Sequence, residues 1–228
     1  NFESAWIDEA YSIQLSTKSV HEIIIGCLND QHPPLYYIFL KLWMAGSINV
    51  AKARLLSAFI GTITIIQTFL IEKELKINSW LFILFSCFYI SVSPMHIWYS
   101  QEARMYIILL FFTLLSVQFS IKILSDLCST KHKTSNFNWI IFIFVNILSL
   151  YTHYFSIFII LFELLNFIFV VRYKKINLKQ ANFGLFSFSA IGLGFVPWIP
   201  VLINQVLFHN LAWIPDTTVN ILIISVNR

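Results

Sequence analysis

The sequence predicts an all-α membrane protein, a polytopic bundle of transmembrane helices with an external loop that carries short surface helices. Hydrophobic residues make up 58% of the 228 residues and charged residues only 11%, which is far from ordinary globular usage. Long apolar runs follow one another along the chain, and several approach the roughly 20 residues that cross a bilayer. These runs are 55–71, 80–95, 106–123, 139–151, 155–171 and 183–203.

Residues 1–52 are expected to form the external loop, with surface or re-entrant helices. This segment begins mixed and polar and contains the adjacent carboxylates Asp8 and Glu9. Adjacent side chains point in different directions, so the two are not expected to address one atom, and simple solvation is the plainer interpretation of such a pair. The motif HPPLYY follows, with His32 just before a double proline that favours a helix start. Its apolar part, 35–45, is too short to span comfortably.

The charges of the loops indicate a topology. If the HPPLYY helix does not span, the basic residues near Lys73, Lys131 and Lys174 fall on one face, which the inward bias of Lys and Arg makes cytoplasmic. Residues 53–203 are then a six-helix transmembrane bundle, and 204–228 an external loop with the start of a further helix. The polar features that gather on the opposite, external face are Asp8, Glu9, His32, Arg54, 101–104, His153 and the loop around Trp213.

Charged and polar residues interrupt the apolar pattern at 93–106, SPMHIWYSQEARMY. Ser100 is expected to cap a new helix and to place Glu102 in its first turn, where the helix dipole favours an anion. Gln101 and Arg104 would then share one helix face and offer an amide and a guanidinium to a phosphate oxygen. This pattern favours an anion site.

An interfacial anchor is an equally good interpretation of the same stretch. Trp98, Tyr99 and Tyr106 would form an aromatic belt at the membrane surface, and Arg104 would contact lipid headgroups. Arg54, at the membrane edge, has the same alternative as a side chain that reaches the headgroups. Position alone leaves both interpretations open.

Polar residues inside the apolar runs point to a rival function, a transporter or lipid flippase. Glu163 lies near the middle of a run, where carboxylates are rare, and it would join Gln67, Gln118 and Asn146 as coupling or substrate residues. However, most ionisable residues gather at one surface and no internal repeat is visible, so the transporter is the second choice.

No cofactor is expected, although a divalent metal stays open. The three cysteines, Cys27, Cys87 and Cys128, lack metal-ligand spacing. No Gly-rich phosphate loop is present in the sequence.

A family resemblance joins several of these motifs. The order DE, HPPLYY, RLLS, SPMHIWYSQEARMY, THYF and WIP resembles the integral-membrane glycosyltransferases of the GT-C fold. The nearest group is the bacterial and archaeal relatives of dolichyl-phosphate-mannose protein mannosyltransferase and of the aminoarabinose transferase. The family's first transmembrane helix would precede Asn1, and its later helices would follow Arg228, so the chain is expected to be a piece of a longer protein.

The resemblance implies a hexosyl- or pentosyltransferase that moves a sugar from a polyprenyl-phosphate donor to a protein, lipid or glycan acceptor. It implies a plasma (inner) membrane location, an active site on the external face and no nucleic-acid partner. Asp8, with Glu9 beside it, matches the catalytic base, and Arg54 matches an arginine near the lipid phosphate. Arg104 is the second expected phosphate ligand, and the expected substrate contacts are His32, Gln101, Glu102, Tyr106 and His153.

Besides the transferase and the transporter, a third possibility is a non-catalytic scaffold subunit that keeps the fold without the base.

Overall fold

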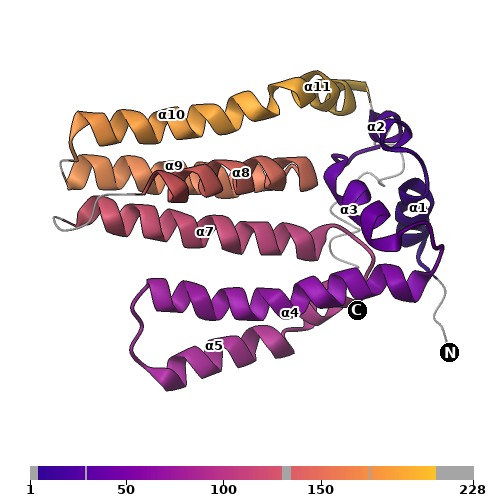
Figure 1. Cartoon of the computed structure of the whole chain (residues 1–228), viewed down its shortest axis with the longest axis horizontal. Helices are drawn as coiled ribbons and strands as arrows, with labels where there is room; N and C mark the ends of the chain where they lie inside the picture. Colours follow the sequence, from indigo (N-terminus) through magenta and orange to yellow (C-terminus); the bar gives the residue numbers. More distant parts are fainter. Residues whose placement is uncertain (1–4, 29, 130–134, 175, 209–228) are drawn as a thin grey trace, which may run out of the picture.

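The structure is a computed structural model that describes residues 5–28, 30–129, 135–174 and 176–208. All regular secondary structure in these ranges is helical (Figure 1). Lys131 and the loop around Trp213, which were expected on opposite faces, lie outside the described residues.

Long apolar helices form the body of the protein. Four helices in the described part of the chain are long and apolar enough to cross a membrane, or five if one bent pair counts as a single span. They are α4 (Val50–Glu74), α7 (Tyr106–Cys128), α9 (Ser156–Tyr173) and α10 (Leu178–Phe195), which continues through η1 (Val196–Trp198) into α11 (Ile199–Phe208). A further apolar helix, α8 (Asn136–Thr152), has 17 residues. The prediction of a multi-pass helical membrane protein is confirmed.

The bent pair corrects the expectation of one continuous span over 80–95. The run divides at Ser93 into α5 (Trp80–Val92) and α6 (Pro94–Gln101), which meet at an angle of 53°. Pro94 explains the break, because proline has no N–H for the helix ladder and disfavours helical backbone at the residue before it. Ser93 is accordingly extended, with ψ 123°.

The expected helix start at Ser100 is wrong. Ser100 lies in the last turn of α6, where its hydroxyl donates to the carbonyl of His96 at 2.7 Å. The chain then leaves the helix, and α7 begins only at Tyr106. Gln101 therefore ends one helix, whereas Arg104 lies in the turn 102–105, and the two do not share a helix face.

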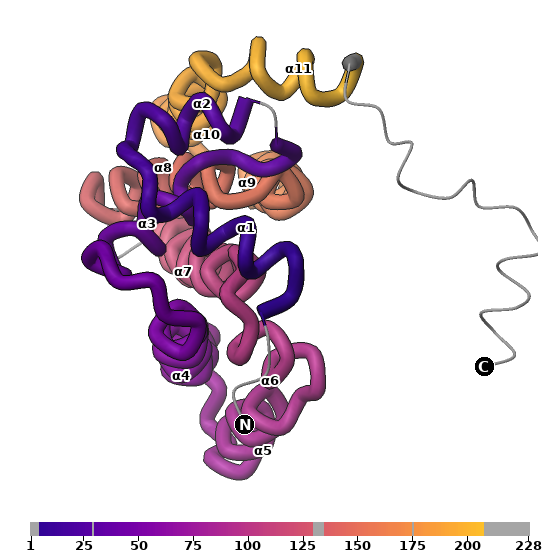
Figure 2. Tube along the Cα trace, turned by 90° about the vertical axis from the view of Figure 1, so that its right-hand side faces the viewer, coloured from indigo at the N-terminus to yellow at the C-terminus, as the bar shows by residue number. Residues whose placement is uncertain are grey.

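Three short helices, α1 (Ile7–Ser16), α2 (Val20–Leu28) and α3 (Leu35–Met44), gather at one end of the bundle in both views (Figures 1 and 2). We call this end the α1 end. The ten residues of α3 do not extend along the bundle, because Ala45 and Gly46, with φ of 47° and 81°, turn the chain into α4. The helix packs beside α1 and buries Tyr36, Tyr37, Leu40 and Met44.

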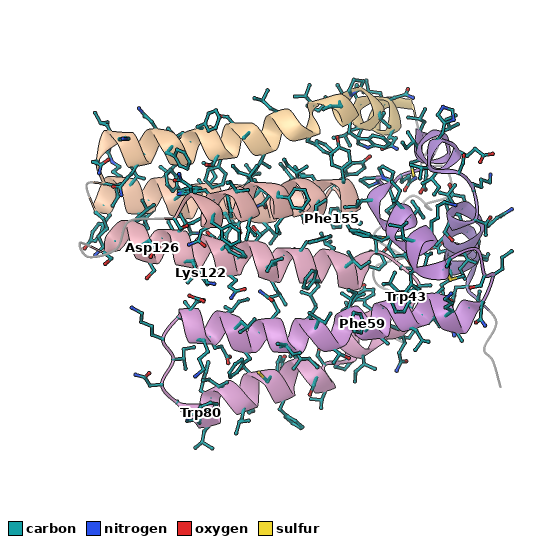
Figure 3. The ribbon with its side chains drawn as sticks, viewed as in Figure 1. Trp43, Phe59, Trp80, Lys122, Asp126 and Phe155 are labelled. Carbon is teal, nitrogen blue, oxygen red and sulfur yellow. The ribbon has the colours of Figure 1, made fainter. Side chains whose placement is uncertain are left out.

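Charge is distributed unequally between the two ends of the bundle. The loops that follow α4 and α9, with Lys76 and Lys174, lie at the end opposite α1 (Figure 1). There Lys122 pairs with Glu74 at 3.1 Å, and Lys73 lies 4.7 Å from the ring of Trp80 (Figure 3). The basic residues of these two loops thus lie at one end of the bundle, and the orientation of that end in the membrane stays a prediction.

The interior of the bundle contains a second set of polar side chains, the interior polar residues Gln67, Ser116, Gln118, Asn146 and Glu163. Gln67 of α4 donates to Gln118 of α7 at 2.5 Å. On another side of α7, Ser116 donates to Glu163 of α9 at 2.8 Å and accepts from Asn146 of α8 at 2.7 Å. These contacts join four helices and fix how they lie along one another.

Candidate functional site

Glu9 is the centre of a charged group at the α1 end. Its side chain is fully buried, and Arg54 from the first turns of α4 binds both carboxylate oxygens, Nε to Oε1 at 2.9 Å and Nη2 to Oε2 at 2.7 Å. The backbone N–H groups of Ala103 and Trp6 donate to the same oxygens at 2.8 and 3.1 Å. Glu9 therefore ties α1 to α4 and to the turn 102–105.

The protonation of Glu9 follows from these bonds. Burial by itself raises the pKa of Glu9, but the hydrogen bonds from Arg54, Ala103 and Trp6 outweigh it, so that the pKa lies below its ordinary value. The carboxylate is thus ionised and occupied on both oxygens. A carboxylate in this state is a poor proton acceptor for a substrate.

Asp8, one residue earlier, is in the opposite situation. Its side chain is 68% exposed, and it forms a long ion pair with Arg104, whose Nη2 lies 3.7 Å from Asp8 Oδ2. Adjacent helix positions diverge, so Asp8 faces outward while Glu9 faces the core. Of the two carboxylates, Asp8 is the one that a substrate can reach.

Arg104 lies in the turn between α6 and α7 and is buried. Its Nη1 is 3.4 Å from the Asp8 carbonyl and 3.4 Å from the Ser12 hydroxyl, and its guanidinium carbon is 5.9 Å from the centre of the Tyr106 ring. These distances to Asp8 and Ser12 are longer than usual N–H···O bonds. Arg104 also has a side-chain hydrogen bond with Tyr106. It has no close bidentate carboxylate partner, whereas the partly exposed Arg54 has one in Glu9.

A histidine pair adjoins Arg104 through Tyr106. The ring centres of His32 and His153 are 5.5 Å apart, and those of His153 and Tyr106 are 5.9 Å apart. His153 Nδ1 accepts the backbone N–H of Phe155 at 3.1 Å, which leaves the proton of a neutral ring on Nε2. Burial, with the nearby His32 and Arg104, lowers the pKa of His153 to about 4. At neutral pH His153 is therefore an uncharged hydrogen-bond donor.

Sequence reasoning missed two members of this site, Asp30 and Tyr36. Asp30 Oδ2 accepts from the Tyr37 hydroxyl at 2.7 Å and lies 3.6 Å from His32 Nδ1. Burial raises the pKa of Asp30, but its contacts with His32 and Tyr37 lower it further, and the net shift is downward. The signal was present, because Asp30 stands two residues before His32 and both tyrosines belong to HPPLYY.

A cavity of about 480 Å³ opens between α1, α4 and α6. Arg54, Gln101 and Glu102 line it, together with the exposed Trp6 and Trp98. Burial raises the pKa of Glu102, and the charge of Arg104 offsets part of this effect. Gln101, expected to share a helix face with Arg104, instead lines this cavity.

A second cavity, of about 470 Å³, lies on the other side of α6, toward α7 and α9. Its walls are mostly apolar and include Tyr99, Tyr106 and Phe155, the last of which is labelled in Figure 3. Trp98 and Ser100 face the first cavity, and His96 and Tyr99 face the second. The short helix α6 is therefore the wall between a polar and an apolar cavity, and Figure 2 shows it between α4, α5 and α7.

All the predicted site residues lie at the α1 end. Asp8, Glu9, Arg54, Glu102 and Arg104 interact with one another, and His32, Tyr106 and His153 join them through ring contacts, with Gln101 at the first cavity. Within the described ranges no group of three His, Cys, Asp or Glu side chains is close enough to hold a metal ion.

Comparisons of the chain with protein-family models, with curated proteins and with solved structures found no match. The function is therefore argued from the chemistry of the site.

Proposed function

We propose that this chain carries the active site of a glycosyltransferase of the GT-C type, which moves a sugar from a polyprenyl-phosphate donor to an acceptor hydroxyl or amine on the external face of the membrane. The observation that carries the proposal is the pair formed by an accessible carboxylate, Asp8, and a buried guanidinium without a close carboxylate partner, Arg104, with Nη2 and Oδ2 3.7 Å apart. Acceptor activation needs the first group and a phosphate leaving group needs the second.

In the proposed reaction, the Asp8 carboxylate takes the proton of the acceptor hydroxyl or amine. The acceptor atom forms a bond to the anomeric carbon while the bond from that carbon to the phosphate oxygen breaks, and the electron pair leaves with the phosphate. Arg104 stabilises the negative charge that develops there. His153, as a neutral donor, is placed to contact a sugar hydroxyl or a phosphate oxygen.

The two cavities suit the two halves of this reaction. An apolar cavity beside Tyr106 and Arg104 fits the first isoprene units of the donor. The cavity lined by Arg54, Gln101 and Glu102 fits a polar acceptor. In this arrangement Glu9 and Arg54 support the site by fixing α1 and the turn 102–105. Arg104, which lines neither cavity but contacts Tyr106 of the apolar one, is proposed as the principal phosphate ligand.

The external face is proposed from charge. Basic residues of the loops after α4 and α9 lie at the end opposite the site, and such residues favour the cytoplasmic side. With that orientation the α1 end faces outward, on the outer side of a plasma (inner) membrane.

The transporter or flippase is retained as the second candidate because of Glu163. Its Oε2 has no hydrogen-bond partner among the described residues, although the side chain is only 2% exposed. A carboxylate oxygen of this kind inside a bundle is a feature of coupling sites.

The test uses protein expressed from its complete reading frame and purified with defined lipid. Transfer is measured with hexosyl and pentosyl polyprenyl phosphates, with nucleotide sugars as a comparison, for the natural chain and for Asp8→Asn. Transfer only from the lipid-linked donors, lost in Asp8→Asn, is expected. Transfer from nucleotide sugars, or lipid translocation in sealed vesicles without any sugar transfer, would contradict the proposal, and the latter would favour the flippase.

A further inference from the structure

Tyr36 and Tyr37 are adjacent on α3, and the two side chains are equally buried, each 0% exposed. Their hydroxyl groups nevertheless differ. The Tyr37 hydroxyl donates to Asp30 at 2.7 Å, whereas the Tyr36 hydroxyl has no hydrogen-bond partner among the described residues. A buried polar group without a partner costs free energy, and phenylalanine would fill the same space without that cost.

The surroundings of the Tyr36 hydroxyl are charged. The groups that act electrostatically on it are Arg104, Glu9 and Glu102. Burial is the largest influence and raises its pKa, so the hydroxyl stays protonated and is available as a donor. Glu9 is not free to accept this proton, because Arg54, Ala103 and Trp6 already bind its two oxygens.

Arg104 is a second buried donor in this region, and apart from a hydrogen bond with Tyr106 its polar contacts are long. Its distances to the Asp8 carbonyl, the Ser12 hydroxyl and Asp8 Oδ2 run from 3.4 to 3.7 Å. A guanidinium with five donor hydrogens and a hydroxyl without an acceptor, both buried and both near one another, need oxygen atoms that carry lone pairs and negative charge. A phosphate group supplies these oxygens.

We propose that the Tyr36 hydroxyl is a phosphate ligand, and that Tyr36 and Arg104 together bind the phosphodiester of the lipid donor and the phosphate monoester of the lipid phosphate product. The inference rests on the proposed function and extends it to a residue of HPPLYY. A neutral donor suits this position, since it adds a hydrogen bond to the phosphate without drawing the neighbouring carboxylates away from their arginines. Because Tyr36 is fully buried, the proposal requires the turn 102–105, which carries Arg104, to move when the phosphate enters.

The test compares Tyr36→Phe with its matched control Tyr37→Phe. Both remove one hydroxyl from equally buried neighbouring rings. Binding is measured by calorimetry in detergent, without any sugar donor, using farnesyl phosphate, inorganic phosphate and farnesol as probes, and thermal unfolding is recorded for each variant. The first probe represents the lipid phosphate, the second a free phosphate, and farnesol has the chain without the phosphate.

Tyr36→Phe is expected to weaken farnesyl phosphate binding about tenfold, as the loss of one hydrogen bond to a charged group predicts, and to leave the melting temperature unchanged or raised. Tyr37→Phe is expected to lower the melting temperature, because Asp30 loses its donor, and to affect phosphate binding less. An equal loss with inorganic phosphate would identify a general phosphate site, whereas a loss confined to farnesyl phosphate would identify a site for the lipid headgroup.

The inference is overturned if Tyr36→Phe binds every probe as the natural chain does, if its loss is as large with farnesol, or if the natural chain binds neither phosphate probe. These outcomes are separate from a failure of the proposed function. Phosphate binding that depends on Tyr36 in a protein that transfers no sugar would leave the phosphate site standing and remove the transferase, and sugar transfer with Tyr36-independent binding would do the reverse.

Discussion

Glu9 at the α1 end and Glu163 inside the bundle are both almost completely buried, at 0% and 2% exposure, but their surroundings differ. Glu9 meets a guanidinium and two backbone N–H groups, which together bind both of its oxygens. Glu163 meets a neutral hydroxyl, from Ser116, and one of its oxygens has no partner among the described residues.

The comparison separates a charged region from a neutral one. At the α1 end, cations and anions lie together beside two cavities, and one carboxylate, Asp8, is left exposed. In the bundle, the interior polar residues bind mostly to one another. Chemistry that moves protons and anions fits the first region, and helix association fits the second.

The largest expected effect is on stability, from Glu9→Gln. The change removes the anionic partner of Arg54 and leaves at least one of the buried donors around position 9 without an acceptor. Because Arg54 is 24% exposed, the cost lies toward or below the lower end of the roughly 3–5 kcal/mol that breaking a buried ion pair costs. Thermal unfolding in detergent measures this loss. Asp8→Asn is the matched control, since Asp8 is exposed, and its melting temperature should stay close to that of the natural chain. Equal melting temperatures for Glu9→Gln and Asp8→Asn would show that Glu9 does not hold the α1 end together.

The next effect is on catalysis, from Arg104→Lys. Lysine keeps the charge but loses the planar fork that binds two phosphate oxygens, so transfer should fall about ten- to a hundredfold. Transfer rate and affinity for the lipid phosphate are both measured. Arg54→Lys serves as the comparison and should mainly lower thermal stability, because its fork binds Glu9.

Unchanged transfer in Arg104→Lys would favour the interfacial anchor, in which lysine replaces arginine with little loss. A larger loss of transfer in Arg54→Lys than in Arg104→Lys would identify Arg54 as the principal phosphate ligand. If losses in the double variant are strongly non-additive, the two arginines serve one phosphate.

A pH dependence tests the neutral state of His153. Its pKa falls from an ordinary 6.5 to about 4 in the folded protein, so between these values the unfolded chain binds a proton that the folded chain does not. Stability is therefore present above pH 6.5 and falls as the pH is lowered toward 4, by an amount on the order of 2 kcal/mol. His153→Gln should remove this part of the pH dependence. Parallel curves of melting temperature against pH for the variant and the natural chain would contradict it.

The smallest effect concerns the interior polar residues. The hydrogen bond between Gln67 and Gln118 should contribute a coupling energy of about 0.6 kcal/mol in a double-mutant cycle with leucine, as polar contacts in membrane bundles do. Sugar transfer should stay unchanged in the double variant. Loss of transfer in a stable double variant would move the function toward the bundle.

The helical membrane fold was predictable from the sequence because apolar runs that approach roughly 20 residues have the length of helices that cross a bilayer. At Pro94 two local effects compete, the apolar pattern that favours one continuous helix and the backbone restriction imposed by proline. The apolar run continues through it, but the backbone restriction that proline imposes on Ser93 prevails and divides the run into α5 and α6. The same break moves Ser100 into the end of a helix rather than the start of one.

The candidate residues were also predictable, but their partners were not. Which arginine meets which carboxylate depends on how α1 lies across α4 and the turn 102–105, and these contacts join residues 45 and 94 positions apart. From their sequence positions, Arg54 and Arg104 were expected to have the same role. In the structure Arg54 forms a close bidentate pair with Glu9, whereas Arg104 lies 3.7 Å from its carboxylate partner Asp8. The unpartnered hydroxyl of Tyr36 is visible only when its buried neighbours are known.

The most direct test of the comparison is to measure sugar transfer from a defined polyprenyl-phosphate sugar by Asp8→Asn and Glu163→Gln side by side. General-base catalysis contributes roughly a hundred- to ten-thousandfold in rate, so Asp8→Asn should lose activity on this scale while remaining folded. Glu163→Gln keeps a group that accepts from Ser116 and should transfer sugar at a rate close to that of the natural chain. Retention of about half of the natural rate by Asp8→Asn, together with a collapse of transfer in a folded Glu163→Gln, would contradict the account.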